Sequence, residues 1–341
     1  MRILFDINHP VDINFFKKSI YALKGDGHSI LIVFRDRGSL AKILEYEIPD
    51  IETIRFGSHQ QGFVGKVVGQ LRRDYDLVSF FRKKDVNLVV SFGPTSVLAS
   101  KVCRIPYLAF DDDFEYKIPF YHANLFATRH IYPDFIDYDS SNTYKYNGFK
   151  ELAYLHPNSL VKSTGILSKY GLKPENYVFI REISNVSLNY RTKNTLLSEV
   201  LGMLKNRNLK IVLSIENKEL GEELRDQCIV LEEPVEDIFS LMAHSLFAIS
   251  SGDTVARETS LMGVPTIYTG GRSMAVNKSL VDNSLMFEAS ELEGVKKAMS
   301  RFDVNFKQES AKRLDSLLKE NWEDTTHVIL RHIKDFEFDR K

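Results

Sequence analysis

Short apolar segments of strand length alternate along the chain with longer segments whose apolar residues recur at helical spacing. In the first half, the apolar segments predict strands at 3–5, 30–34, 88–90 and 107–110. Helices are expected between them, at 11–24, 40–46, 63–81 and after Pro94. The second half repeats the pattern, with strands predicted at 177–180, 210–215, 229–231, 246–249 and 266–268 and helices at 195–205, 219–227, 235–242 and 255–262. Strands that alternate with helices predict parallel β-sheets covered by helices on both faces.

The segment between the two halves, residues 156–176, has a mixed pattern with two prolines and two glycines. We interpret it as a linker, because 341 residues are enough for a domain on either side of it. The sequence thus predicts an N-terminal Rossmann-like domain at 1–155 and a C-terminal one at 177–320. Residues 321–341 are expected to form a C-terminal helix that packs back on the N-terminal domain.

Composition excludes several classes of protein. The chain is 43% hydrophobic and 27% charged, as in ordinary soluble globular proteins, and its net charge of −1 indicates no affinity for nucleic acid. Cys103 and Cys228 are far apart in sequence, which argues against a disulfide or a thiolate metal site and favours a reducing compartment. The N-terminus reads as a strand, and no apolar run approaches the roughly 18 residues that a membrane span needs. We therefore expect a cytoplasmic protein.

Polar residues gather directly after the predicted strands, where doubly wound sheets bind their ligands. In the first half they are Asp6, Asn8, His9, Asp12, Ser91, Gly93, Thr95, Asp111, Asp112, Asp113 and Glu115. In the second half they are Arg181, Glu182, Ser184, Glu232, Glu233, Ser251, Gly252, Asp253 and Thr254.

The stretch SSGDTVARE, which starts at Ser250, joins a strand to a helix through small residues. Free backbone N–H groups at the positive end of a helix dipole favour an anion, best of all phosphate. Gly252 permits close approach, Asp253 or Thr254 can cap the helix, and Glu258 is placed to accept hydrogen bonds from a sugar diol such as a ribose. The alternative is a capped loop followed by Glu258 as a solvated surface charge.

The longer stretch SSGDTVARETSLMGVPTIY resembles the donor-site segment of GT-B glycosyltransferases, such as the UDP-GlcNAc transferase of peptidoglycan synthesis, and of UDP-GlcNAc 2-epimerases. Glu258 followed by Gly263-Val264-Pro265 keeps the spacing of that segment. The resemblance implies a diol-binding Glu258 and a phosphate-binding turn made of Ser251, Gly252, Asp253 and Thr254. VLEEPVEDIFSLMAHS resembles the segment that holds uracil, which implies that Glu233 and Val235 lie near a base. We add Ser184 to the donor-binding residues.

A second resemblance spans nearly the whole chain. The stretches DINHPVDINFFK, FDDDFEYKIPF, YNGFKELAYLHP and YVFIREISN look like the family known as domain of unknown function 354, which is itself glycosyltransferase-like. The resemblance implies the α/β GT-B fold, with two Rossmann-like doubly wound domains facing each other across a cleft. The family often shows an Arg-Phe pair with a His a few residues on, whereas here Glu182 follows Arg181 and Tyr190 lies near the His position. This departure leaves the substrate and part of the chemistry open.

Sugar transfer needs a cation for the diphosphate leaving group and a base for the acceptor hydroxyl. Arg181 is the candidate clamp, because guanidinium matches phosphate oxygens bidentately; the alternative is a surface ion pair with a neighbouring Glu. His9 is the first candidate base, or else a structural hydrogen-bonding residue, and Asp12 could orient or replace it. Asp111 or Asp113 is expected to contact the acceptor or the base, or else belongs to a capped, solvated turn. We expect no metal site, no Mg²⁺ dependence and no cofactor.

The predicted helix at 63–84 bears on localisation. An apolar stripe is expected to pack on the sheet, and it consists of Val64, Val67, Leu71, Tyr75 and Val78. Basic and aromatic residues remain beside this stripe, namely Lys66, Arg72, Arg73, Arg82, Lys83, Lys84, Phe63, Phe80 and Phe81. They suit either a peripheral contact with the anionic inner face of a membrane or a solvated helix face.

The sequence favours a glycosyltransferase that moves a hexosyl or N-acetylhexosaminyl group from a nucleotide sugar, expected to be UDP-linked, without a metal. Its acceptor would be a glycan, a lipid-linked molecule or a small molecule, in keeping with a role in cell-envelope polysaccharide, and its contacts would lie in the N-terminal domain. A non-hydrolysing nucleotide-sugar 2-epimerase is the first alternative, because it needs carboxylate acid–base groups and no acceptor. A non-catalytic nucleotide-sugar-binding protein is the second.

Overall fold

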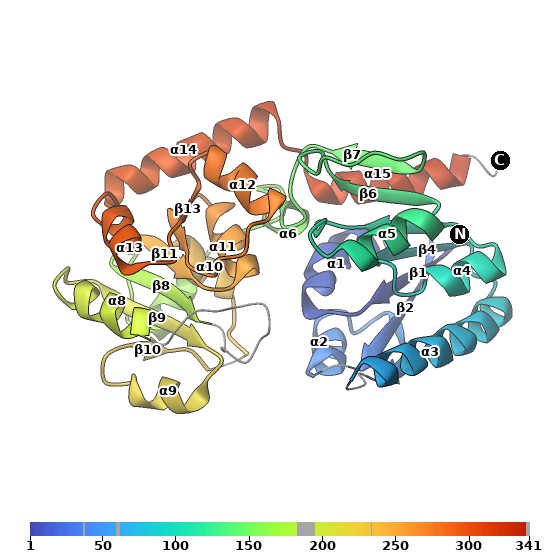
Figure 1. The fold of residues 1–341 in the computed structure, drawn as a ribbon, viewed down its shortest axis with the longest axis horizontal. Helices are drawn as coiled ribbons and strands as arrows, with labels where there is room; N and C mark the ends of the chain where they lie inside the picture. The colour runs from blue at the N-terminus through green and yellow to red at the C-terminus, as the bar shows by residue number, and fades with distance from the viewer. Residues whose placement is uncertain (37, 59–61, 183–194, 233, 339–341) are drawn as a thin grey trace. The chain divides into compact units, whose positions relative to one another are not determined.

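The computed structural model describes residues 1–341 except 37, 59–61, 183–194, 233 and 339–341. The chain divides into two compact units (Figure 1). Unit 1 contains Met1–His156 and Glu323–Lys341, and unit 2 contains Pro157–Trp322. The polypeptide therefore passes between the units twice. Each unit is built on a sheet of parallel strands, so the expected α/β class with doubly wound sheets is confirmed.

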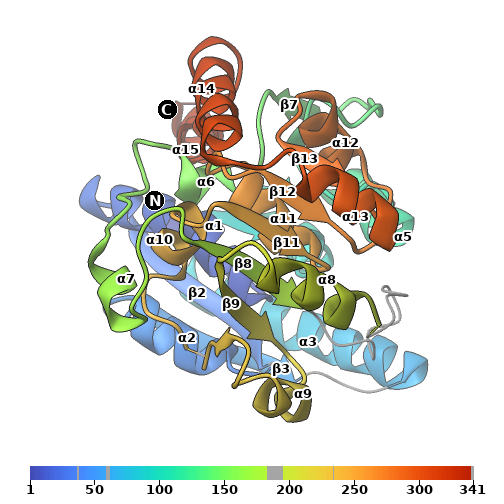
Figure 2. The same ribbon diagram turned by 90° about the vertical axis from the view of Figure 1, so that its left-hand side faces the viewer.

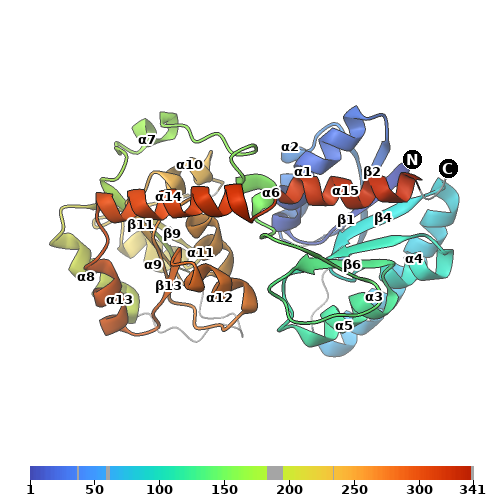
Figure 3. The same ribbon diagram turned by 90° about the horizontal axis from the view of Figure 1, so that it is seen from above.

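The sheet of unit 1 has the order β3-β2-β1-β4-β5-β6-β7. Its strands are β1 (Arg2–Ile7), β2 (Ser29–Asp36), β3 (Glu52–Ser58), β4 (Leu88–Phe92), β5 (Tyr107–Phe110), β6 (Arg129–Pro133) and β7 (Thr143–Tyr146). Its helices are α1 (Pro10–Gly25), α2 (Leu40–Glu47), α3 (Phe63–Lys84), α4 (Val97–Cys103), α5 (Lys117–Phe126), α6 (Leu152–Leu155) and α15 (Thr325–Phe338). Figure 3 shows α1, α2 and α15 on one face of this sheet and α3, α4 and α5 on the other, and Figure 2 gives the view of Figure 1 turned by 90° about the vertical axis.

The sheet of unit 2 has the order β10-β9-β8-β11-β12-β13. Its strands are β8 (Tyr177–Glu182), β9 (Lys210–Ile215), β10 (Ile229–Val230), β11 (Phe247–Ser250), β12 (Thr266–Tyr268) and β13 (Met286–Glu288). Its helices are α7 (Gly165–Lys169), α8 (Thr195–Lys205), α9 (Lys218–Glu223), α10 (Ile238–Ala243), α11 (Asp253–Ser260), α12 (Ala275–Asp282), α13 (Leu292–Met299) and α14 (Val304–Glu320).

Strand order locates the ligand-binding edge of each sheet. The chain adds strands to one side of β1 and β8 and then crosses to the other side, where β4 and β11 pair with them. Such reversals are the topological switch points at which doubly wound sheets bind ligands, beyond the carboxyl ends of the strands. The central strands are buried on both faces, which explains the continuous apolar runs that made them predictable.

Helix α3 does not pack as its apolar pattern predicts. Leu71 and Tyr75 belong to the predicted packing stripe, but they are 61% and 77% exposed. The face of α3 that is buried carries Arg73, Leu77 and Phe81 instead. The prediction is wrong because it placed Arg73 on the surface, whereas its guanidinium is fully buried and pairs with a carboxylate on β1. The side chains of Phe63, Val64, Lys66 and Val67 lie outside the described part of the structure.

Helix α15 belongs to unit 1 although it follows unit 2 in the chain. It packs beside α1 and α6, and Ile329 and Ile333 are fully buried. The Thr325 hydroxyl donates to the Phe149 carbonyl oxygen at 2.7 Å. The side chains of Arg129 and Asp335 form an ion pair at 2.8 Å, which fixes the last turns of the helix to β6.

Candidate functional site

The switch point of unit 2 lies at the turn from β11 into α11. Ser250 is paired with Arg181 of β8, and the next residue, Ser251, donates its backbone N–H to the Arg181 carbonyl oxygen at 3.0 Å. Helix α11 begins at Asp253, and its N-cap is Gly252, which gives no side-chain hydrogen bond to the first turn. The expectation that Asp253 or Thr254 caps the helix is therefore wrong. Gly252 has no side chain that could cap the first turn, and a helix that starts in this way suits an anion.

Two contacts hold this turn in shape. The Ser250 hydroxyl donates to the Gly252 carbonyl oxygen at 2.8 Å and lies 3.1 Å from the Gly252 nitrogen. The loop after β12 packs closely against the turn, because a Cβ atom on Gly270 would overlap the Ser251 carbonyl oxygen and the Tyr268 ring. Glycine at 270 is thus required for the close approach of the two loops.

Asp253 turns its carboxylate toward the loop after β12. The Tyr268 hydroxyl donates to Oδ1, and Arg272 Nη1 lies 2.8 Å from Oδ2. Asp253 is buried, whereas the Arg272 side chain is 26% exposed. Arg272 therefore neutralises the Asp253 carboxylate at the start of α11. Its guanidinium lies beside the positive end of the helix. No local sequence signal pointed to Arg272, because it lies 19 residues after Asp253 in a separate loop.

Glu258 is buried on α11, with 6% of its surface exposed. Its neighbour Arg257 is also buried, at 3% exposed. The alternative that Glu258 is a solvated surface charge is therefore wrong. A carboxylate that is buried away from water needs compensating hydrogen bonds, so Glu258 is not an incidental surface residue of this helix.

Arg181 and Glu182 end β8 beside the same turn. Arg181 donates to the Ser214 hydroxyl and to Glu216 Oε1, both at 2.8 Å. The contact with Glu216 is an ion pair with a neighbouring Glu, which is the sequence-based alternative to a phosphate clamp. Burial raises the pKa of Glu182 to about 7, against the opposing effects of the Ser251 hydroxyl and of Arg181. An acid that titrates near neutrality therefore lies next to the turn.

The residues expected near a base lie around β10 and α10. Val235 is half-buried in the segment that joins these two elements. Glu232 is exposed and pairs with Arg225 at 2.7 Å. Ser184 and Glu233, both predicted to contact the donor, lie outside the described residues, as does Tyr190.

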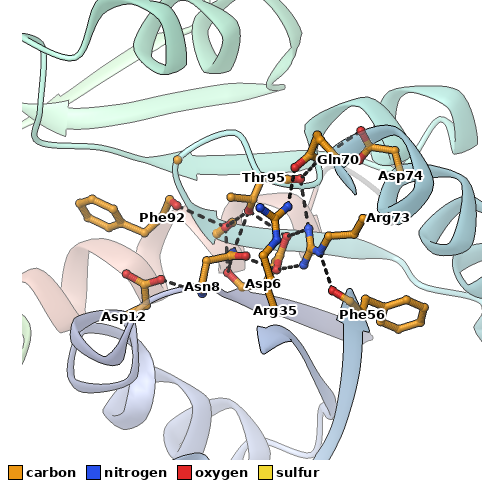
Figure 4. A network of polar contacts seen from close by, with 12 residues as sticks. Asp6, Asn8, Asp12, Arg35, Phe56, Gln70, Arg73, Asp74, Phe92 and Thr95 are labelled. Carbon is orange, nitrogen blue, oxygen red and sulfur yellow. Dashed lines mark hydrogen bonds and ion pairs between the residues drawn. The ribbon is translucent and has the colours of Figure 1, made fainter. Parts of the chain in front are cut away.

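The switch point of unit 1 is occupied by a buried ion pair (Figure 4). Arg73 reaches from α3 to Asp6 at the end of β1, with Nη2 2.6 Å from Oδ1 and Nη1 3.2 Å from Oδ2. Both side chains are fully buried. Burial alone would raise the pKa of Asp6, but the charge of Arg73 outweighs it and the pKa is lowered. Thr95 and Asn8 complete the network, since the Thr95 hydroxyl donates to Asp6 and the Asn8 amide donates to both.

His9 and Asp12 form a capping box at the start of α1. Val11 N–H donates to His9 Nδ1 at 3.3 Å, and Asp12 Oδ2 accepts the N–H groups of Asn8 and His9, each at 2.9 Å. His9 is exposed, whereas Asp12 is buried. Burial raises the pKa of Asp12 to about 7 despite these two hydrogen bonds. Both residues therefore have a structural role, and Asp12 has in addition the pKa of a general base.

Lys150 connects several other charged residues of unit 1. Its Nζ atom lies 2.8 Å from Asp112 Oδ2, 4.0 Å from Glu151 Oε1 and 5.2 Å from the centre of the Phe92 ring. Its charge also opposes the rise that burial causes in the pKa of Asp12. The ammonium group of Lys150 therefore links three stretches that are far apart in sequence, namely DINHPVDINFFK, FDDDFEYKIPF and YNGFKELAYLHP. Neither Lys150 nor Glu151 was predicted, because nothing near them in sequence indicates their partners.

The aspartates after β5 differ in their surroundings. Asp111 Oδ1 accepts the N–H groups of Asp112 and Asp113 at 2.8 and 3.1 Å, and Oδ2 lies 3.5 Å from Nε2 of the buried His130. Asp111 and Asp112 are buried, whereas Asp113 is half-buried. Asp112, which we had not selected, carries the contact to Lys150. Among the described residues, no three His, Cys, Asp or Glu side chains are arranged to hold a metal ion.

Comparison with known proteins identifies relatives of the whole architecture. The family described as "Protein of unknown function (DUF354)" matches residues 133–336. An uncharacterized protein of Methanocaldococcus jannaschii is 22% identical over 316 residues, which cover 85% of this chain and 88% of that protein.

Two solved structures resemble the chain over almost its full length. The UDP-GlcNAc 2-epimerase of Neisseria meningitidis bound to UDP-GlcNAc gives a TM-score of 0.71 at 10% identity and covers 98% of this chain and 100% of that one. MurG of Acinetobacter baumannii gives a TM-score of 0.64 at 12% identity, with 98% and 100% covered. Both have the GT-B fold, so the expected GT-B fold is confirmed.

Proposed function

The chain belongs to the DUF354 family, and from that premise we propose that it is a glycosyltransferase that uses a nucleotide sugar as its donor. The turn into α11 carries this proposal, because it combines an N-terminus without a side-chain cap, the cation Arg272 and the buried Glu258. The likeness to proteins solved with UDP or UDP-GlcNAc supports a UDP-linked donor. The sugar and the acceptor are left to experiment.

The donor is proposed to bind with its diphosphate on the first turn of α11. Glu258 lies four residues beyond Thr254, which is about 6 Å along the helix axis and matches the reach from a phosphate to its ribose. Its carboxylate would accept hydrogen bonds from the ribose diol. Arg272 would offset the negative charge that develops on the leaving diphosphate. Arg181, which the sequence predicts for this role, stays a second candidate, because each of the two guanidinium groups is paired with a carboxylate.

The proposed acid–base chemistry resides in unit 1. Asp12, or His9 beside it, would remove the proton from the acceptor hydroxyl. The acceptor oxygen then bonds to the anomeric carbon of the sugar, the bond from that carbon to the phosphate oxygen breaks, and the nucleoside diphosphate leaves with the electron pair. Lys150 would keep the charges of the neighbouring carboxylates balanced while the proton moves. No metal is required for these steps.

A nucleotide-sugar 2-epimerase is the second candidate. It is favoured by the gathering of buried carboxylates at the carboxyl ends of the strands of unit 1, namely Asp12, Asp111, Asp112 and Glu151. Inversion at C2 of a sugar requires groups that remove and return protons, and such groups need pKa values near neutrality. Incubation with UDP-GlcNAc alone, followed by proton NMR, separates the two candidates. A new epimer without an acceptor supports the epimerase, and UDP release only when an acceptor is added supports the transferase.

Substitution of Glu258 tests the donor site. A hydrogen bond from a ribose hydroxyl to a carboxylate is worth roughly 1.5–3 kcal/mol, so Glu258→Ala should weaken binding of UDP at least about tenfold. Glu258→Gln should fall between, because its amide retains one acceptor and turns the other into a donor. Calorimetric titration of UDP measures both, and thermal unfolding verifies that the variants fold. Glu293, which is 87% exposed on α13, provides the matched control Glu293→Ala. Wild-type affinity in both Glu258 variants would contradict the donor site.

A further inference from the structure

Exposed apolar side chains concentrate on three helices of unit 1. The described residues include twelve large hydrophobic side chains that are exposed, and eight of them lie on α3, α4, α5 or the N-cap of α5. These eight are Val68, Leu71, Tyr75, Val102, Tyr116, Ile118, Tyr121 and Leu125. The opposite face of the same sheet, covered by α1, α2 and α15, contributes Tyr46. Single exposed apolar residues are normal on proteins, but a group on neighbouring helices indicates an interaction surface.

The eight side chains point away from the core. Helices α3, α4 and α5 are neighbours on one face of the sheet (Figures 2 and 3). On α3, Leu77 and Phe81 are buried, and Leu71 and Tyr75 are four residues apart on the other side of the helix. Helix α5 repeats this arrangement, because Phe120 and Ala123 are buried while Ile118, Tyr121 and Leu125 recur at spacings of three and four. These helices thus present apolar residues to solvent in addition to the apolar residues that they bury.

The same helices and their caps carry an excess of exposed positive charge. The exposed basic residues are Arg72, Arg82, Lys83, Lys101, Arg104 and Lys117. The exposed acidic residues are Asp76, Asp85 and Glu115. The whole chain has a net charge of −1, so the excess is a property of this face. A two-fold contact between two copies would place this positive surface against itself, which argues against a dimer here.

We propose that the outer surface of α3, α4 and α5 binds an anionic lipid bilayer. Side chains such as Leu71, Ile118 and Leu125 would enter the boundary between headgroups and acyl chains, tyrosines would lie at the headgroup level, and the basic residues would contact lipid phosphates. No helix among the described residues is long and apolar enough to cross a membrane, so the contact is peripheral. This surface differs from the one that the sequence predicts, because it excludes the buried Arg73 and Phe81 and extends to α4 and α5.

Cosedimentation with vesicles tests this surface independently of any sugar chemistry. The vesicles contain phosphatidylcholine alone or with about a third of phosphatidylglycerol, near the anionic content that attracts polybasic surfaces. The apolar variant combines Leu71→Ser, Tyr75→Ser, Ile118→Ser and Leu125→Ser. The charge variant combines Arg72→Glu, Arg82→Glu and Lys83→Glu. The control variant changes exposed residues of α2 and α15 on the other face, and combines Lys42→Glu, Tyr46→Ser, Arg331→Glu and Lys334→Glu.

The wild type and the control variant should bind the anionic vesicles and not the neutral ones. The charge variant loses electrostatic attraction to the lipid phosphates and the apolar variant loses insertion between the headgroups, so each should lose at least about tenfold in partitioning. Equal binding of all four proteins, or no binding of the wild type, would overturn the proposal. So would a concentration-dependent dimer in light scattering that the apolar variant abolishes, because the surface would then bind a second copy. Retained binding of UDP by both variants would show that the proposed donor site is unaffected.

Discussion

Replacement of Arg73 by methionine should destabilise unit 1 severely. Arg73 and Asp6 are fully buried, and besides the two contacts to Asp6 the guanidinium donates to the carbonyl oxygens of Phe56 and Thr95, each at 3.1 Å. Methionine fills most of the volume but leaves Asp6 as a buried carboxylate without its cation, which costs about 3–5 kcal/mol. Arg72→Met is the matched control, because Arg72 is exposed one residue away and its loss should change stability by under about 0.5 kcal/mol.

Urea unfolding at several pH values measures the effect and its cause. In the wild type the pKa of Asp6 is lowered, so this residue stabilises the fold above its unfolded pKa of 3.8 and the contribution is lost as the pH falls through the folded value. Without Arg73, burial raises the pKa of Asp6, and the variant should gain stability as the pH falls from 7 to 4, by up to about 1.4 kcal/mol per pH unit. The double variant Asp6→Asn with Arg73→Met should recover part of the loss at pH 7. A loss equal to that of Arg72→Met, or one that does not depend on pH, would refute the reasoning.

Two further predictions concern stability. The pKa of Asp12 is raised from 3.8 to about 7, so ionisation opposes folding and its contribution to stability falls as the pH rises from 4 to 7. Asp12→Asn, which keeps an acceptor oxygen, should gain roughly 3 kcal/mol relative to wild type over that range in urea unfolding. Gly263 has φ +80°, and a Cβ atom there would lie 2.9 Å from Cα of Ala311, so Gly263→Ala should lower the free energy of unfolding by about 1–3 kcal/mol. Gly202→Ala on α8, where a Cβ atom meets nothing within 4 Å, is the control and should raise it by about 0.5–1 kcal/mol; a similar sign for both would contradict the argument.

Most of the strands that the sequence predicts share one property, which is burial of a continuous apolar run. Strands such as β4 and β5 are covered on both faces, so their sequences LVV and YLAF stand out. β6 was missed because RHIYP contains an arginine, a buried histidine and a proline, and its His130 is accommodated by Phe120, Tyr132 and the distant Asp111. β13 has three residues and gives no pattern of its own.

The residues of the candidate site also divide into those that the sequence could predict and those that it could not. Positions directly after predictable strands, such as Asp6, Asp12 and Ser251, could be found because topology fixes where a strand ends. Arg73, Lys150 and Arg272 could not, because each is attached to a helix or loop and acquires its role from a carboxylate at least 19 residues away. Arg73 also violates the rule that the buried face of a helix is apolar, and so it shifted the predicted face of α3.

The double passage of the chain between the units has a consequence for biosynthesis. Unit 2 is continuous from Pro157 to Trp322, so its whole sheet has been synthesised before α15 is made. Unit 1 is started first but lacks α15, whose Ile329 and Ile333 are fully buried, until unit 2 has been made. The usual order, in which the N-terminal domain matures first, is therefore reversed. During synthesis, the surface on α1 and α6 that α15 later covers therefore stays uncovered until the whole of unit 2 has been made.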